Sequence, residues 1–182
     1  MLMSGKKNRS RIGQTLVEAM VAMTILTTGL LGMFTLLSRS FFIGRNLEDQ
    51  TKGTYLAAEG IELAKNMIDH DVYLGLATGG AAGGWGVCFP FGVGGNADYE
   101  IDYATKACPL TTFLGTGRKL NFNAATDLYG YGAGTPTSYV RRIRITKPSA
   151  NEIDVQSIVT WSTGPLNGQS ITLEDHFYNW HP

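Results

Sequence analysis

The side chain most suggestive of chemistry in this 182-residue sequence is a carboxylate beside an apolar segment. Glu18 directly precedes twenty consecutive uncharged residues, Ala19 to Ser38. An acid in or beside an apolar phase is costly unless water or headgroups solvate it or a cation pairs with it. Glu18 is therefore a candidate for a functional ion pair, and an interfacial acid without a special role is the alternative.

The two cysteines are the next reactive groups. Cys88 and Cys108 are the only cysteines of the chain. An even number of cysteines in an oxidising compartment favours a disulfide. Closing a loop of about 20 residues in this way would contribute about 3 kcal/mol of stability in the chain-entropy model. Two buried free thiols are the alternative.

Two groups of charged side chains could bind ions or a partner. Three acids share one face of a predicted strand: Asp98, Glu100 and Asp102. They could bind calcium, but the spacing of an EF-hand loop is absent, so a solvated strand face is favoured. Three arginines lie close together further along the chain: Arg141, Arg142 and Arg144. They could bind DNA or another anionic partner, although pairing with the acidic strand or with the long helix is favoured.

Patterns typical of enzymes are missing from the sequence. There is no Walker lysine after the glycines, no G-x-G-x-x-G between a strand and a helix, no G-x-S-x-G and no H-E-x-x-H. The three histidines show no ligand spacing with either cysteine. The 15 basic and 15 acidic residues balance, which excludes a strongly basic nucleic-acid binder. We predict no catalytic residue, no metal and no cofactor, and therefore a protein that is not an enzyme.

A basic segment and an apolar helix must position Glu18. Four basic residues and no acid precede residue 14: Lys6, Lys7, Arg9 and Arg11. The apolar run is long enough to span a hydrocarbon core of about 30 Å, and it lacks the small-residue exit of a secretory signal peptide. We predict a retained membrane anchor whose basic end stays in the cytoplasm. A buried helix of a soluble domain is the alternative.

The helix is expected to continue beyond the membrane to about Asp69. Residues 40–69 contain no proline, and apolar or small residues recur there at steps of three and four: Leu56, Ala57, Gly60, Leu63, Ala64 and Met67. Such spacing gives one apolar face that can pack on a domain. From Thr15 to Ile68 the helix would be roughly 80 Å long, so half of it must serve as a stem.

The remainder of the chain reads as a glycine-rich loop followed by strands. Nine glycines fall between Gly75 and Gly95, a composition that excludes regular helix. The aromatic residues of this loop are expected to pack over the sheet, and a ligand or subunit contact is the alternative. Alternation predicts four strands: Tyr99–Tyr103, Tyr139–Thr146, Ile153–Trp161 and Ser170–Phe177. Short turns at Pro148–Asn151 and Gly164–Gly168 predict an antiparallel meander.

Gly13 and the residues after it, Gln-Thr-Leu-Val-Glu-Ala-Met-Val-Ala, closely resemble the processing motif of type IV prepilins and type II secretion pseudopilins. In that family a membrane peptidase cuts directly after the glycine, the new amino terminus is N-methylated, and the fifth mature residue is a glutamate. The resemblance implies cleavage between Gly13 and Gln14, N-methylation of Gln14, and subunit assembly through Glu18. Gln14 departs from the usual phenylalanine, which affects methylation more than cleavage, because cleavage depends mainly on the glycine.

The resemblance also implies an organisation and a set of partners. The fold would be α+β and pilin-like, with a long N-terminal helix packed on a small antiparallel β-sheet. The expected parts are a cleaved leader (1–13), a transmembrane or filament-stem half of the helix (14–38), an exposed half (39–69), a glycine-rich loop (70–98) and a sheet (99–182). The implied partners are prepilin peptidase, other pilin subunits, an inner-membrane assembly platform, the membrane before assembly, and a surface or DNA ligand of the head.

The expected function is that of a minor pilin-like structural subunit of a type IV pilus. The protein would be held in the cytoplasmic membrane as a single-pass protein with its head outside the cytoplasm, and would then enter a cell-surface pilus. A minor pseudopilin of a type II secretion system is the alternative. A less favoured hypothesis is a single-pass membrane-anchored enzyme or receptor. Under that hypothesis Gly13 and Glu18 could be replaced without effect.

Overall fold

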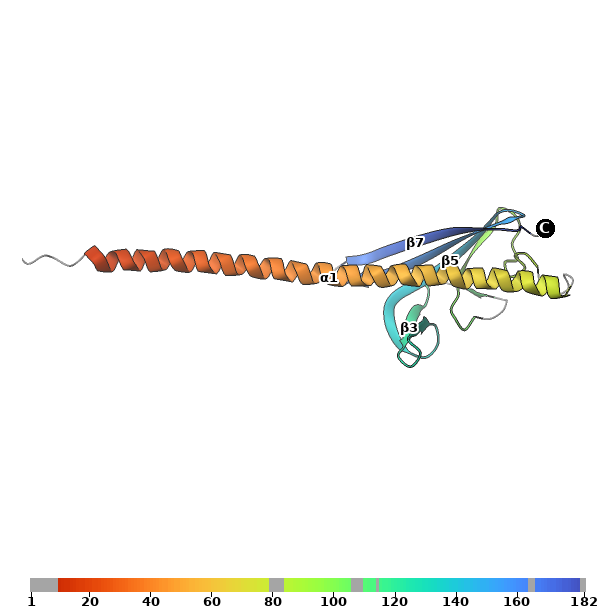
Figure 1. The fold of residues 1–182 in the computed structure, drawn as a ribbon, viewed down its shortest axis with the longest axis horizontal. Coiled ribbons are helices and arrows are strands. Elements are labelled where there is room, and N and C mark those ends of the chain that lie inside the picture. The colour runs from red at the N-terminus through yellow and green to blue at the C-terminus, as the bar shows by residue number, and fades with distance from the viewer. Residues whose placement is uncertain (1–9, 79–83, 106–109, 114, 164–165, 181–182) are drawn as a thin grey trace, which may run out of the picture. The chain divides into compact units, whose positions relative to one another are not determined.

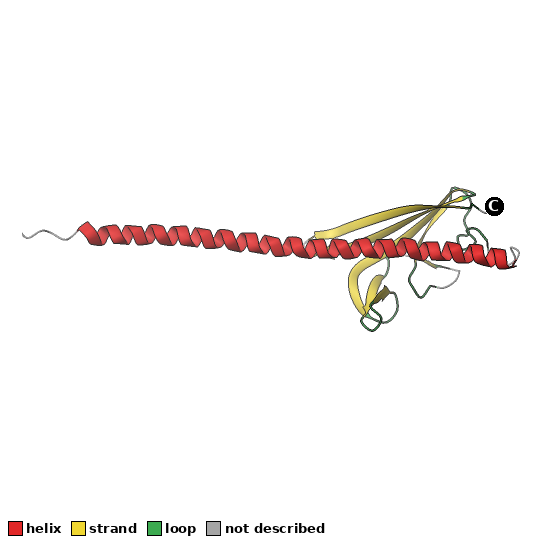
Figure 2. Ribbon diagram, in the orientation of Figure 1, coloured by secondary structure: helices red, strands yellow, loops and turns green. Residues whose placement is uncertain are grey.

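The computed structural model describes residues 10–78, 84–105, 110–113, 115–163 and 166–180, without the side chains of 10–14, 163, 166 and 167. It contains one helix and seven strands (Figures 1 and 2). The elements are α1 (Ser10–Thr78), β1 (Asn96–Glu100), β2 (Thr111–Thr112), β3 (Lys119–Asn123), β4 (Leu128–Gly130), β5 (Thr135–Ser149), β6 (Glu152–Thr163) and β7 (Leu166–Tyr178). The chain divides into two compact units, one ending at Asn46 and the other beginning at Leu47.

The first unit is the amino-terminal part of α1. Leucine is its commonest residue, and it contains no proline, the residue that most strongly interrupts a helix. Among the described residues, α1 is the helix that is long and apolar enough to cross a membrane by length and composition. The predicted apolar stem is therefore present as one continuous helical segment.

The second unit contains the rest of α1, which runs further than predicted. The helix ends at Thr78, so the predicted end at Asp69 and the predicted start of a loop at residue 70 are wrong. Asp71 is buried and accepts a hydrogen bond from the Cys88 backbone N–H at 2.7 Å. This contact and the partial burial of Val72 give the last turns a tertiary partner, which outweighs the low helix propensity of the nearby Gly75.

The helix face turned to the sheet is the one that the spacing predicts. Most residues of the predicted stripe are buried, and Leu63 is half-buried. Gly60 is required on this face because the sheet approaches it closely. A Cβ at that position would lie 2.7 Å from Ile143 Cδ1 and 3.1 Å from Arg141 Cδ, which is closer than packed atoms normally approach.

The sheet is antiparallel throughout and is built around β5. This strand pairs with β6 along one side and with β1 and β3 along the other, while β2 lies outside β1 and β4 outside β3. β6 pairs in turn with β7, so β5, β6 and β7 form the predicted meander. The first strand, which the sequence predicts over Tyr99–Tyr103, runs from Asn96 to Glu100, so its predicted last three residues are wrong. Sequence alternation also missed β2, β3 and β4, which are short and lie in a segment that contains several glycines and asparagines.

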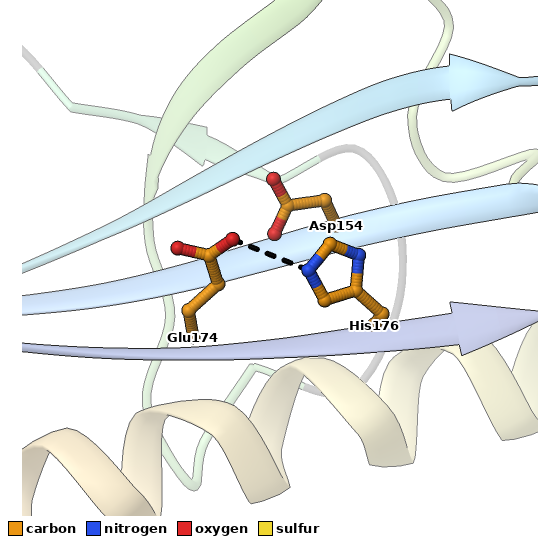
Figure 3. Close-up of side chains that lie close together, drawn as sticks. All are labelled: Asp154, Glu174 and His176. Atoms are coloured by element: carbon orange, nitrogen blue, oxygen red, sulfur yellow. Dashed lines mark ion pairs between the residues drawn. The ribbon is translucent and has the colours of Figure 1, made fainter.

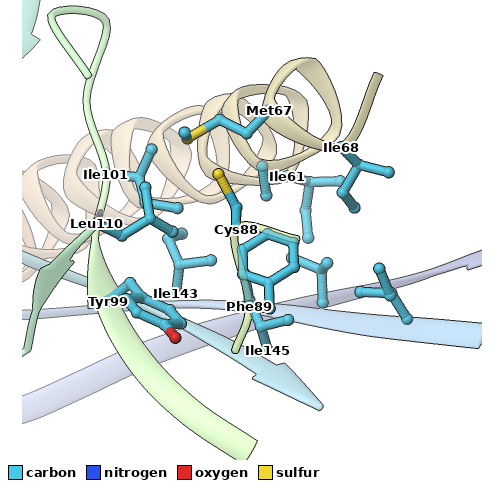
Figure 4. Packing of buried hydrophobic residues seen from close by; sticks show 13 residues of the cluster. Ile61, Met67, Ile68, Cys88, Phe89, Tyr99, Ile101, Leu110, Ile143 and Ile145 are labelled. Atoms are coloured by element: carbon cyan, nitrogen blue, oxygen red, sulfur yellow. The ribbon is translucent and has the colours of Figure 1, made fainter. Parts of the chain in front are cut away.

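Two groups of buried side chains join the helix to the sheet. The larger group contains Phe89 from the glycine-rich loop, Tyr99 and Ile101 from the region of β1, and residues of α1, β5 and β6 (Figure 4). Leu173 and Phe177 of β7 are partly buried and pack against it. Phe89 is fully buried, and Trp85 and Phe91 pack against this group. The predicted packing role of the loop aromatics is confirmed.

Candidate functional site

The stem presents an apolar surface that the described residues of the chain leave uncovered. Each described side chain from Thr15 to Ile43 is exposed, and Phe34, for example, keeps 65% of its surface accessible. A continuous apolar surface of this extent in water is unfavourable, at roughly 25 cal/mol per Å² of apolar area. The stem therefore requires lipid or the helices of other subunits.

Glu18 is the one charged residue between Thr15 and Ser38. Its side chain is exposed, and no ion pair joins it to another described residue. It lies four residues after Gln14 on α1, which places the two positions on the same face, one turn apart. Glu18 can therefore face an amine at position 14, either of its own chain or of a neighbouring one.

The predicted cleavage bond between Gly13 and Gln14 lies within the first turns of α1, which begins at Ser10. The side chains of residues 10–14, and everything about residues 1–9, lie outside the described part of the chain. Cleavage and methylation at this bond stay predictions from the sequence.

Cys88 lies in a buried site at the end of α1. Its Sγ atom is 3.4 Å from Asp71 Oδ1, and its backbone N–H donates to Asp71 Oδ2. Burial raises the pKa of Asp71, and the hydrogen bond from the Cys88 backbone opposes that shift. Cys108 lies outside the described residues, so a disulfide between the two cysteines stays a prediction.

The three clustered arginines point to opposite faces of β5. Arg141 faces the helix and is fully buried; its Nη1 lies 3.1 Å from Glu59 Oε2, and its guanidinium donates to the backbone carbonyls of Leu56 and Ile101 at 3.2 and 2.8 Å. This arginine therefore ties the long helix to the sheet and to the end of the first strand.

Arg142 and Arg144 lie on the other face of β5, opposite β1. Arg144 donates twice to Asp98, at 2.8 and 3.1 Å, and Arg142 lies 3.7 Å from the same carboxylate. The hydrogen bond from Arg144 lowers the pKa of Asp98, against a smaller opposing effect of burial. The expectation that the arginines pair with the acidic strand and with the helix is confirmed.

The expectation of a solvated acidic strand face is wrong for two of its three members. Glu100 is buried and accepts a hydrogen bond from the Arg118 backbone at 2.9 Å, beside the Arg118 side chain. Asp102 is buried and accepts backbone N–H groups of Ala104 and Tyr131. Their donors come mostly from downstream segments, which strand alternation does not reveal.

A pocket of about 390 Å³ lies between the last turns of α1, the loop at Trp85 and the end of β7. Its walls are mainly aromatic, with one lysine and one aspartate among the lining residues: Trp85, Phe177, Tyr178, Trp180, Lys65 and Asp69. The two opposite charges give this pocket no excess of positive charge for a phosphate backbone.

Sequence reasoning missed a group of metal-ligating side chains on β6 and β7: Asp154, Glu174 and His176. Asp154 and His176 are direct cross-strand partners. A hairpin register counted from the predicted turn would have placed Asp154 opposite Tyr178, because the observed register shifts between Trp161 and Thr163. Strand alternation alone marks Asp154 and His176 only as polar.

One family model matches the chain, that of the prokaryotic N-terminal methylation motif, over residues 8–34. The match covers the predicted cleavage bond, Glu18 and most of the apolar run. No curated protein and no solved structure matches the chain. The match therefore concerns the amino-terminal segment of the chain.

Proposed function

We propose that this chain, whose amino-terminal segment matches the prokaryotic N-terminal methylation motif over residues 8–34, belongs to the type IV pilin and pseudopilin family and is a minor pilin. In this proposal it is a structural, non-catalytic subunit of a type IV pilus. The observation that carries the proposal is the match over residues 8–34, in which a glycine, a glutamate five residues on and an exposed apolar helix coincide.

Cleavage changes the charge of the amino terminus in two ways. It removes the leader with its four basic residues, and it creates a free amine at Gln14. Before cleavage the leader charges oppose entry of the helix end into an apolar bundle, because burying unpaired charges costs several kcal/mol each. After cleavage a single cation remains at the helix tip.

We propose that the amine of one subunit pairs with Glu18 of its neighbour. Both groups would otherwise be unpaired charges among apolar stems, so the pair favours one axial stagger between adjacent helices. The exposed apolar surface of the stem supports this proposal, since it needs a covering that other stems can supply. In the membrane, before assembly, lipid supplies that covering.

The first experiment is intact-mass measurement with amino-terminal sequencing of the membrane-extracted protein, beside a Gly13→Ala variant. We expect a wild-type chain that begins at Gln14, heavier by one methyl group if it is methylated, and an uncut variant. A wild-type chain that retains Lys6 to Arg11 in cells with an active prepilin peptidase would contradict the proposal and would favour an ordinary membrane anchor.

The second experiment tests Glu18 in assembly. We expect Glu18→Ala to be cleaved normally but to be depleted from sheared filaments, because the incoming amine loses its partner. Glu48→Ala is the matched control, since Glu48 is another exposed acid of α1 and its ion pair is with Lys52, one turn away on the same helix. Normal recovery of Glu18→Ala in filaments would contradict the assembly role.

The same stem would serve a pseudopilin of a type II secretion system, and the motif is common to both classes. The identity of the filament separates them. Recovery of the protein with surface pili supports the minor-pilin proposal, and recovery only with a secretion apparatus, with loss of secretion on deletion, supports the alternative.

A further inference from the structure

We propose that Asp154, Glu174 and His176 form a binding site for one first-row divalent metal ion, of the class of Zn²⁺, on the outer face of the β6–β7 hairpin. The three side chains lie together on neighbouring strands (Figure 3). Each offers one ligand atom, and the three atoms lie within 4.8 Å of one another. The proposal depends on the head alone and is independent of the role of the stem.

The hairpin register creates this group. Asp154 on β6 is directly opposite His176 on β7, and Gln156 is opposite Glu174. Because side chains alternate between the faces of a strand, all four positions lie on the face turned away from the buried Ile153 and Val155. The site is therefore built on two regular strands, which hold its members more rigidly than a loop would.

The distance between the first two ligand atoms fits a small ion. His176 Nε2 lies 3.2 Å from Glu174 Oε1. Two ligands bound tetrahedrally at about 2.0–2.1 Å from a zinc ion are separated by about 3.3 Å. An ion can therefore replace the proton between these two atoms with little movement of either side chain.

Neighbouring side chains orient these two ligands from outside the group. Glu152 Oε1 lies 3.1 Å from His176 Nδ1 and also accepts a hydrogen bond from the Tyr178 hydroxyl at 3.2 Å. A carboxylate on the second ring nitrogen is the usual support of a metal-bound histidine, because it fixes the tautomer that leaves the first nitrogen free. Gln156 donates to Glu174 Oε2 at 3.0 Å, which leaves Oε1 to face the histidine.

The third ligand is a carboxylate with an unused oxygen. Asp154 Oδ1 is shielded from solvent and has no hydrogen-bond partner among the described residues. A shielded carboxylate oxygen without a donor is unfavourable, so this atom itself indicates a missing cation or donor. It is an observation separate from the contacts between Glu174 and His176.

The charges of the site also require a cation. Three carboxylates meet here, those of Glu152, Asp154 and Glu174, and a protonated His176 would supply only one positive charge. A divalent ion with a neutral imidazole balances the charge better. One nitrogen and two oxygen ligands suit zinc or manganese better than calcium or magnesium, which prefer oxygen ligands alone.

The test is a calorimetric titration of the detergent-solubilised full chain, free of any affinity tag, with ZnCl₂ and separately with CaCl₂. We expect one saturable zinc site per chain and no saturable calcium site. His176→Ala should abolish the saturable zinc heat, and Glu152→Gln should weaken zinc affinity by about 10- to 100-fold, as losses of supporting partners do.

Asp175→Asn is the matched control. It removes one negative charge from the residue next to His176 on β7, whose side chain points to the opposite face of the strand. It should bind zinc as the wild type does. No saturable zinc binding, zinc binding that survives His176→Ala, or an equal loss in Asp175→Asn would each overturn the proposal; the last would indicate general attraction of cations to an acidic surface. Circular dichroism of the metal-free variants establishes that each is folded.

Discussion

Arg141 and Glu59 form a buried ion pair, and replacing its two members should lower stability by unequal amounts. Glu59→Ala should cost more than Arg141→Met, although Glu59 is the more exposed of the two residues. Arg141 has no exposed side-chain surface, whereas the side chain of Glu59 is 32% exposed. After Glu59→Ala the guanidinium stays buried, with two carbonyl acceptors but no anion. After Arg141→Met the charge itself is gone, and Glu59 can turn to water.

The magnitudes follow from what each variant leaves unpaired. Removing one partner of a buried ion pair costs about 3–5 kcal/mol of stability. For Glu59→Ala we expect a loss of about 3 kcal/mol, at the lower end of this range, because water can enter at the vacated Glu59 position and partly solvate the guanidinium. For Arg141→Met, methionine fills much of the volume, and the Leu56 carbonyl keeps its helical hydrogen bond. The Ile101 carbonyl loses its donor, which costs about 1–3 kcal/mol. The double variant should match Arg141→Met, because the exposed glutamate contributes little alone.

The assay is denaturant unfolding of the detergent-solubilised chain, followed by tryptophan fluorescence from Trp85 and Trp161 in the head. The four proteins form a double-mutant cycle, and we expect a coupling energy above about 1 kcal/mol. A loss below about 1 kcal/mol for Glu59→Ala, together with additive effects in the double variant, would refute the view that the carboxylate compensates the buried guanidinium.

Two further predictions concern packing and pH. Gly60→Ala should lower the free energy of unfolding by about 1–2 kcal/mol, because crowding against Ile143 outweighs the gain of about 1 kcal/mol in helix propensity. Gly44→Ala is the control, because a Cβ at that position would meet nothing within 4 Å, and it should not destabilise the protein. Thermal unfolding of both variants beside the wild type measures the difference. Arg144 lowers the pKa of Asp98 from its ordinary value of 3.8, so this pair stabilises the fold above that pH and the stabilisation is lost as the pH falls through the lowered pKa. Asp98→Asn should therefore be less stable than the wild type by about 1 kcal/mol at pH 7. In denaturant unfolding this difference should shrink as the pH falls below 3.8 and through the lowered pKa; a difference independent of pH would contradict the assignment.

The leader, the apolar stem and the position of Glu18 could be predicted because each of them is defined by residues that are neighbours in the sequence. A run of uncharged residues after a basic segment indicates a membrane anchor whatever the fold of the rest of the chain. The apolar spacing from Leu56 to Met67 likewise identifies the buried face of the helix without knowledge of its partner. The long strands Thr135–Ser149 and Glu152–Thr163 alternate clearly enough to be found in the same way.

The end of the helix and the surroundings of the charged groups depended on contacts between distant segments. The last turns of α1 are held by Asp71 and the backbone at Cys88, and Glu100 is buried because Arg118 comes back to it. Neither partner can be read from local periodicity. The three clustered arginines illustrate the same limit: strand alternation separates Arg141 from its neighbours, but only the packed helix decides that Arg141 is the buried one.

The amino-acid order alone therefore determines the parts of this protein that depend on local sequence: a basic amino-terminal segment, an apolar helix and one acid five residues after Gly13. The packed head is a different matter. Its buried ion pair between Arg141 and Glu59 exists because the long helix packs on β5. Its group of proposed ligands at His176 exists because the register of β6 and β7 brings Asp154 opposite His176. Register is a property of the whole sheet, since a shift of one residue would turn every side chain to the opposite face.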